Sequence, residues 1–326
     1  MRIRSRPFLL FANPPKIRVD VRFCGLTGSD ALLWLGGHRG DPGPTAVLGF
    51  EVSGTILEMG RLAHERTGYQ MGEKVVVHNH PVCGGLAESC LAHYTDVFNL
   101  TGRASLKDSA IVMDDYFSAL LAMGRRARIQ RNECFLINAK HSRSALAVID
   151  LAIGVFGAKP IALCKDSRRA KLCADLGAEV LCDRNEECLP NKLRELTGKE
   201  EVRLMIETED GPYFRSVVKS LEHDGLIALL DDARNKRHPD FYLMSPNYTV
   251  FAVAAEHYKV ADPLIYRETM QHLLDYHSEC AIRPRISAIF GLHRINDAFD
   301  YYTTVPSGNV LIDMKDLDRL TVCDKF

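Results

Sequence analysis

The chain has 326 residues, more than one hydrophobic core usually fills, so we expect two lobes. Its 41 Lys and Arg against 42 Asp and Glu give a formal net charge of -1, which excludes a strongly basic protein that binds nucleic acid or an anionic membrane surface. No apolar run approaches the roughly 18 residues of a membrane-spanning helix. The 10 cysteines are scattered and form no CxxC pair, which predicts reduced thiols.

The first 18 residues are basic and contain no acid, as in a mitochondrial presequence, although the segment is short. The alternative is an ordinary strand over residues 8–11, followed by a turn at Pro14 and Pro15. The apolar run is also too short for a secretory signal. We therefore expect a cytoplasmic protein, with mitochondria as the alternative compartment.

Residues 16–100 consist of short β segments broken by glycines. Residues 17–23 alternate apolar and polar side chains with a period of two, and 47–56 and 74–78 are predicted as further strands. This pattern predicts an antiparallel, partly closed β lobe over residues 1–110.

From about residue 111, short apolar strands alternate with amphipathic helices. Strands are predicted at 133–138, 160–164, 179–182, 202–207 and 226–230, and helices at 115–128, 144–156, 168–176, 189–196 and 212–221. Such alternation implies right-handed crossovers and a doubly wound parallel sheet, which we assign to residues 111–262. The tail, residues 263–326, has too few strands for a core of its own, so we expect it to rejoin the first lobe. Its predicted elements are helices at 266–276 and 295–301 and strands at 286–290 and 309–313.

The turn after strand 133–138 is where a doubly wound sheet would bind a dinucleotide pyrophosphate. It contains no glycine, and this argues against close approach of a phosphate to the backbone. Ala145 could replace a glycine in helix packing, whereas Ser142 adds a side chain where the phosphate would approach. The candidate cations beside the helix start are Lys140, His141 and Arg143. A solvated basic turn without a ligand is the alternative.

The end of the second strand, at 160–164, would carry an acid in an NAD-specific domain. This chain has Cys164 there, followed by Lys165, Arg168 and Arg169. These cations favour the 2'-phosphate of NADP(H). The alternative is that they form the solvated face of a helix.

Several motifs, in order and spacing, resemble the medium-chain dehydrogenases/reductases. In the first half they are RVDVRFCGLTGSD (18–30), LGFEVSG (48–54), GEKV (72–75) and GGLAE (84–88). The second half is similar to the quinone oxidoreductase-like protein 2 branch of the zinc-independent quinone reductases, in RRARIQ (125–130), LAVID (146–150), LGA (176–178) and INDAF (295–299).

This resemblance implies a GroES-like catalytic lobe, an interrupting Rossmann domain, an NADPH site between them and a homodimer. It implies that Thr27 lines the substrate pocket, that Tyr116 and Ser118 lie beside the nicotinamide and phosphates, and that Arg169 binds the 2'-phosphate. Zinc is not expected, because Thr27 and Phe50 stand where zinc-dependent relatives have Cys and His. His78, His80, Cys83 and Cys90 also crowd one region, but strand alternation places some of them on opposite faces, so no metal is predicted.

The chain departs from the family at its cofactor loop. Ala139, Ser142 and Ala145 replace the pattern AxxGxxG, and the other departures are Lys165, Asp166, Asp210, Asp231 and Asp232. Carboxylates facing a polyanionic cofactor would weaken its binding, although they could equally be ordinary surface acids. Two functions therefore remain open. One is an NADPH-dependent reductase of a quinone or an enone. The other is a non-catalytic binding or scaffold protein that has lost dinucleotide affinity.

Overall fold

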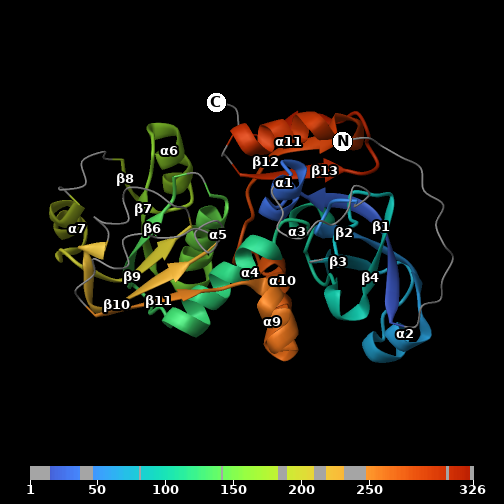
Figure 1. The fold of residues 1–326 in the computed structure, drawn as a ribbon, viewed down its shortest axis with the longest axis horizontal. Coiled ribbons are helices and arrows are strands. Elements are labelled where there is room, and N and C mark those ends of the chain that lie inside the picture. Colours follow the sequence, from blue (N-terminus) through green and yellow to red (C-terminus); the bar gives the residue numbers. More distant parts are fainter. Residues whose placement is uncertain are drawn as a thin grey trace. The chain divides into compact units, whose positions relative to one another are not determined.

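The structure is a computed structural model, and it describes residues 15–36, 47–80, 82–140, 142–182, 189–208, 218–230, 247–305 and 308–323. The chain forms two compact units (Figure 1). Unit 1 comprises Met1–Asp114 and Glu256–Phe326, and unit 2 comprises Asp115–Ala255. The predicted strand at 8–11 lies outside the described residues.

Unit 1 is built on an eight-stranded sheet in the order β14-β12-β13-β1-β2-β3-β5, with β4 also paired to β1. Its strands are β1 (Lys16–Gly25), β2 (Glu51–Met59), β3 (Lys74–His78), β4 (Ser89–His93), β5 (Val97–Asn99), β12 (Ile286–Gly291), β13 (Asn309–Asp313) and β14 (Leu320–Val322). The alternation in β1 buries Ile17, Val19 and Val21 completely, because successive side chains of a strand point to opposite faces. The predicted antiparallel β lobe is confirmed by these pairings.

Helices cover and connect the strands of unit 1. They are α1 (Gly28–Trp34), α2 (Arg61–Thr67), α3 (Leu106–Ser109), α9 (Ala255–Ala261), α10 (Pro263–Ser278) and α11 (Ile295–Thr304). Sequence periodicity did not predict α1, α2 or α9. Each of these helices has only 7 residues, too few for a clear helical repeat.

The C-terminal segment completes the sheet of unit 1, because β13 lies between β12 and β1. Asp313, at the end of β13, is completely buried and accepts hydrogen bonds from Arg22, from Arg319 at 3.0 Å and from two backbone N–H groups. Burial alone would raise the pKa of Asp313, but these hydrogen bonds lower it to about 2. An ionised carboxylate therefore holds the C-terminal segment against β1.

Unit 2 contains a parallel six-stranded sheet in the order β11-β10-β9-β6-β7-β8. Its strands are β6 (Cys134–Asn138), β7 (Lys159–Leu163), β8 (Glu179–Leu181), β9 (Val202–Glu207), β10 (Leu221–Leu229) and β11 (Tyr248–Ala252). Helices α5 (Ser144–Leu151) and α6 (Ser167–Asp175) lie on one side of the strands and α7 (Leu189–Thr197) on the other (Figure 1). The predicted doubly wound fold is confirmed.

Two predicted helices of unit 2 end in π-helical turns. The helix predicted at 115–128 consists of α4 (Asp114–Leu120) and a π-helix over Leu121–Ala127, and α5 continues as a π-helix over Ala152–Phe156. Gly157, with φ of 61°, ends the latter in the left-handed region. Most of the predicted helix at 212–221 lies outside the described residues. Within the described part of the chain, no helix is long and apolar enough to cross a membrane.

Candidate functional site

The turn from β6 to α5 is the predicted phosphate-binding segment of unit 2. Asn138, at the end of β6, donates from Nδ2 to Glu207 Oε1 at 2.5 Å, and the Thr208 hydroxyl donates to the Asn138 carbonyl at 2.7 Å. These bonds tie the start of the turn to the end of β9. Ala139 and Ala145 are completely buried, so the two positions accept only small side chains, as the family pattern requires.

Helix α5 begins at Ser144 without a side-chain cap, since its N-cap residue Arg143 provides none. Ser144 donates instead from its hydroxyl to Asp115 at 2.8 Å. Lys140 is buried and Arg143 is half-buried, and both are close to this helix start in the chain. An uncapped N-terminus flanked by cations suits an anion, because its first N–H groups have no partners within the helix.

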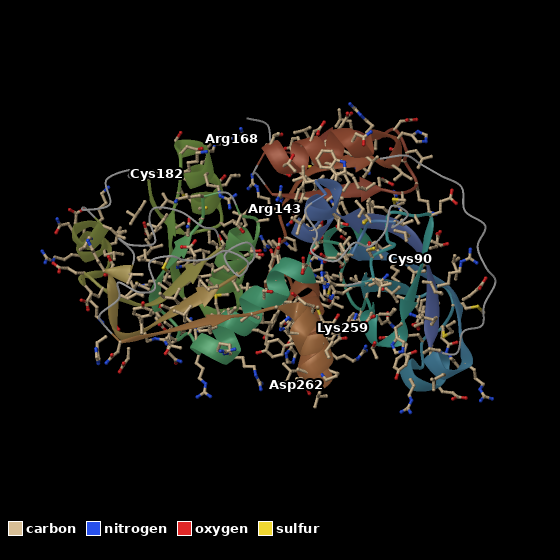
Figure 2. All side chains as sticks on the ribbon, in the orientation of Figure 1. Cys90, Arg143, Arg168, Cys182, Lys259 and Asp262 are labelled. Carbon is tan, nitrogen blue, oxygen red and sulfur yellow. The ribbon has the colours of Figure 1, made fainter. Side chains whose placement is uncertain are left out.

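The cations after β7 divide into exposed and buried side chains. Lys165 and Arg168 are exposed, and Figure 2 shows Arg168 on α6 and Arg143 at the start of α5. Arg169 is only 3% exposed, and it donates from Nε to the Ala139 carbonyl at 2.6 Å and from Nη2 to the Ser142 carbonyl. Its guanidinium group therefore binds the backbone of the β6–α5 turn.

Asp166 has a structural role that the sequence comparison did not predict. It is the N-cap residue of α6, and its side chain accepts from the Arg169 N–H at 2.8 Å. Asp at an N-cap stabilises a helix by binding one of its unpartnered N–H groups. The carboxylate is therefore already bound to backbone. Asp210, Asp231 and Asp232 lie outside the described residues.

Cys164, Cys173 and Cys182 interact with one another near the ends of β7 and β8. Sequence reasoning missed this cluster. Cys164 N–H donates to the Leu181 carbonyl at 2.9 Å, which extends the pairing of the two strands toward Cys182. A hydrogen bond from Cys164 lowers the pKa of the Cys173 thiol, against the effect of burial and with help from Arg169. The cysteines come from separate elements, so no local spacing could have indicated the cluster.

Tyr116 and Ser118 are both buried in α4. The Tyr116 hydroxyl donates to Asp150 Oδ2 at 2.7 Å, which links α4 to α5. Burial, and then the Asp150 charge, raise the pKa of Tyr116 well above its usual value, so the phenol keeps its proton. Tyr116 is thus a hydrogen-bonding link within unit 2.

Thr27 lies at the start of α1 in unit 1 and forms a capping box with Asp30. The Thr27 hydroxyl donates to Asp30 Oδ2 at 2.9 Å, and Gly49 N–H donates to Asp30 Oδ1 at 2.7 Å. Gly49 has φ of 101°, and a Cβ there would lie 2.4 Å from Leu86 N, so this close approach requires glycine. Burial raises the pKa of Asp30 to about 6, although these hydrogen bonds partly offset the effect.

Phe50 is buried, and its ring lies 4.8 Å from the ring of His80. Among the described residues, no group of three or more His, Cys, Asp or Glu side chains is placed to hold a metal ion. His78, His80, Cys83 and Cys90 are described residues, and they form no such group.

Comparisons with known proteins agree with this architecture. Residues 13–120 match the alcohol dehydrogenase GroES-like domain, and residues 145–261 match the zinc-binding dehydrogenase family. The chain is 30% identical to quinone oxidoreductase-like protein 2 of Rattus norvegicus over 307 residues, which covers 93% of this chain and 86% of the relative. It is 29% identical to the quinone oxidoreductase-like protein 2 homolog of Nematostella vectensis over 309 residues. That match covers 92% of this chain and 82% of the relative.

Among solved structures, Escherichia coli quinone oxidoreductase complexed with NADPH has a TM-score of 0.80 at 17% identity, with 96% of this chain and 95% of that chain covered. The matched domains and this fold define a medium-chain dehydrogenase/reductase. Within that class, the chain belongs to the quinone oxidoreductase-like protein 2 family, as its motifs predicted. An oxidoreductase-like role follows for the family.

Proposed function

We propose that this protein transfers a hydride from NADPH to a small quinone or enone. The observation that carries the proposal is the cationic surface after β7. Lys165 and Arg168 are exposed there, while the nearby acid, Asp166, is bound to the N-terminus of α6. Two exposed cations beside a carboxylate that is hydrogen-bonded to backbone suit a 2'-phosphate and favour NADPH over NADH.

Unit 2 contains the types of side chain that bind a dinucleotide. The uncapped start of α5, with Lys140 and Arg143, would bind the pyrophosphate, and Ala139 and Ala145 supply the small side chains of the turn. Ser118 would add a hydroxyl donor, whereas the Ser142 side chain stands where the phosphate would approach. The reduced nicotinamide supplies the hydride when it is bound, and the protein positions the partners.

We assign no zinc to this reaction, and we keep Thr27 and Tyr116 as proposed substrate-pocket residues. Family membership also supports a homodimer as the expected assembly, with no nucleic acid or membrane as a partner. The cytoplasm remains the expected compartment, with mitochondria as the alternative.

A second candidate function is supported by Arg169. Its side chain binds the carbonyls of Ala139 and Ser142, at the turn where a phosphate would approach the backbone. If this contact is permanent, the protein is a non-catalytic binding or scaffold member of the fold. Function depends on the site and not on the fold alone.

Calorimetric titration with NADPH and NADH separates the two candidates. The reductase predicts micromolar binding of NADPH, much weaker binding of NADH, and oxidation of bound NADPH on addition of a quinone. Absence of heat with both nucleotides would contradict the reductase and support the non-catalytic function.

A further inference from the structure

His78, at the end of β3, is 1% exposed, and its Nδ1 lies 2.8 Å from the hydroxyl of Tyr266 on α10. Burial raises the pKa of Tyr266 well above its usual value, so the phenol keeps its proton and can donate it to this nitrogen. When the phenol donates, the Nδ1 of His78 is the acceptor. A neutral ring must then carry its proton on Nε2.

The Nε2 of His78 is buried and makes no hydrogen bond among the described residues. It lies 3.8 Å from Oδ1 of Asp114, a distance that is too long for a hydrogen bond but within reach of an ion pair. A buried polar nitrogen without a hydrogen-bond partner is unfavourable, and native proteins seldom keep one without a reason.

His80, two residues further along the chain, also has one ring nitrogen with a neighbour and one without, but the two nitrogens are exchanged. Its Nδ1 is also buried without a hydrogen-bond partner, and its Nε2 lies 3.4 Å from the hydroxyl of Ser29. The rings of His78 and His80 are nearly parallel, with centroids 6.2 Å apart. Two imidazoles, one carboxylate and one hydroxyl thus form a group within unit 1, which we call the His78–His80 cluster.

The backbone at His80 is fixed from α9. Lys259 donates from Nζ to the His80 carbonyl at 2.7 Å and lies 2.8 Å from Asp96 Oδ1. Figure 2 shows Lys259 on α9. This anchoring keeps the imidazole of His80 between Phe50 and Ser29.

Charged groups from three elements face His80. Burial is the largest effect and lowers the pKa of His80, and the charges of His78 and Lys259 act in the same direction. Asp114 and Glu256 oppose them. The protonated ring of His80 is therefore a stronger acid than a histidine in water.

Ser29 is the solvent-accessible end of the cluster. It is half-exposed and lies two residues after Thr27, the position that the family resemblance assigns to the substrate pocket. Phe50, which packs on His80, occupies the place of a zinc ligand in zinc-dependent relatives. The cluster is therefore adjacent in the chain to Thr27, which we assign to the substrate pocket.

We propose that Ser29 and His80 supply the proton that completes substrate reduction, and that His78 and Asp114 are positioning residues for His80. This inference rests on the proposed reductase function. Hydride addition to a quinone or enone leaves an oxyanion on the substrate. The Ser29 O–H bond breaks as the substrate O–H bond forms, and the His80 Nε2–H bond breaks as Ser29 regains its proton. Both electrons come from the hydride, which leaves NADP+, and His80 then regains a proton from the solvent, so that one H+ is consumed in each turnover.

The test measures quinone reduction by NADPH across pH 5 to 9 for the wild-type protein, His80→Gln, Ser29→Ala and the double variant. In the wild type, kcat should fall as pH rises through the pKa of His80. Each single variant should lose about 100-fold in kcat and lack this pH dependence, which is typical of a lost general acid. The double variant should lose no more than either single variant, because the two groups act as one unit. NADPH affinity and thermal stability should be unchanged in Ser29→Ala.

His223→Gln is the matched control, because its side chain is 70% exposed and lies in unit 2. It should retain the wild-type rate and pH profile. An active wild type whose pH profile persists in His80→Gln and Ser29→Ala would overturn the relay and leave the reductase function intact. A wild type that binds NADPH but reduces no quinone or enone would overturn the proposed function.

A second readout requires no activity. Nitrogen NMR of the histidine rings should show His78 with its proton on Nε2, and Tyr266→Phe should shift protons toward Nδ1 because the donor to that nitrogen is lost. Finding the wild-type His78 proton on Nδ1 would contradict the relay. Retention of the Nε2 proton together with a His80 titration that moves in Asp114→Asn would support it.

Discussion

Arg169 donates from Nε to the carbonyl oxygen of Ala139 at 2.6 Å, across 30 residues of chain. The side chain that family resemblance assigns to the 2'-phosphate thus supports the turn that would bind the pyrophosphate. Arg168, the neighbouring residue, is exposed.

This relationship predicts different effects for the two arginines. Arg169→Ala should lower the free energy of unfolding by about 2 kcal/mol, since a hydrogen bond from a charged group contributes about 1.5–3 kcal/mol. It should weaken NADPH and NADH binding alike. Arg168→Ala should weaken NADPH binding about tenfold and leave NADH unchanged. Urea denaturation and calorimetry measure both effects. A stable Arg169→Ala protein that loses only NADPH affinity would assign the phosphate to Arg169.

The glycine-free turn can be tested by restoring glycine at two positions separately. Ser142→Gly should strengthen NADPH binding, because it removes a side chain from the phosphate approach. Ala145→Gly should instead lower the free energy of unfolding by about 1 kcal/mol, because Ala145 is a buried residue of α5 and glycine is a poor helix former. If Ser142→Gly weakens binding, the turn depends on the Ser142 side chain.

Tyr116→Phe removes the donor to Asp150 inside unit 2. The free energy of unfolding should fall by about 1–3 kcal/mol, because the carboxylate of Asp150 loses a hydrogen bond. Tyr248→Phe, on the edge strand β11, serves as the control and should change stability little. Steady-state kinetics add a second criterion. If Tyr116 also lines the substrate pocket, Tyr116→Phe should raise the KM for the quinone.

Asp30 predicts a stability that depends on pH. Its pKa is about 6 in the folded protein against 3.8 for the free group, so the folded state binds more protons between these values. Stability from this group is therefore present at low pH and is lost as pH rises from about 4 to 6, by about 3 kcal/mol in total. Asp30→Asn should lack this component in denaturation measured at several pH values. Equal pH slopes for both proteins would contradict the prediction.

The sequence predicted most of unit 2 because its strands and helices are defined by local periodicity. Strand 133–138 and helix 144–156 needed no information from elsewhere in the chain. The contact of His78 with Tyr266 spans 188 residues, so no local pattern could reveal it. Asp166 and Asp30 are different cases. Each stands at or near a helix start in a pattern typical of caps, so the local sequence carries a signal for both roles.

The neighbours of β1 impose an order on biosynthesis. This strand pairs with β2 on one side, and on the other with β4 over residues 16–20 and with β13 over residues 23–25, where Phe23 faces Asp313. A ribosome makes residue 23 long before residue 313, so the end of β1 is an unpaired strand edge while the whole of unit 2 is being translated. Such edges attract other extended chains. We therefore expect the interrupted lobe to mature last, and a chaperone that binds extended segments to be needed most during that interval.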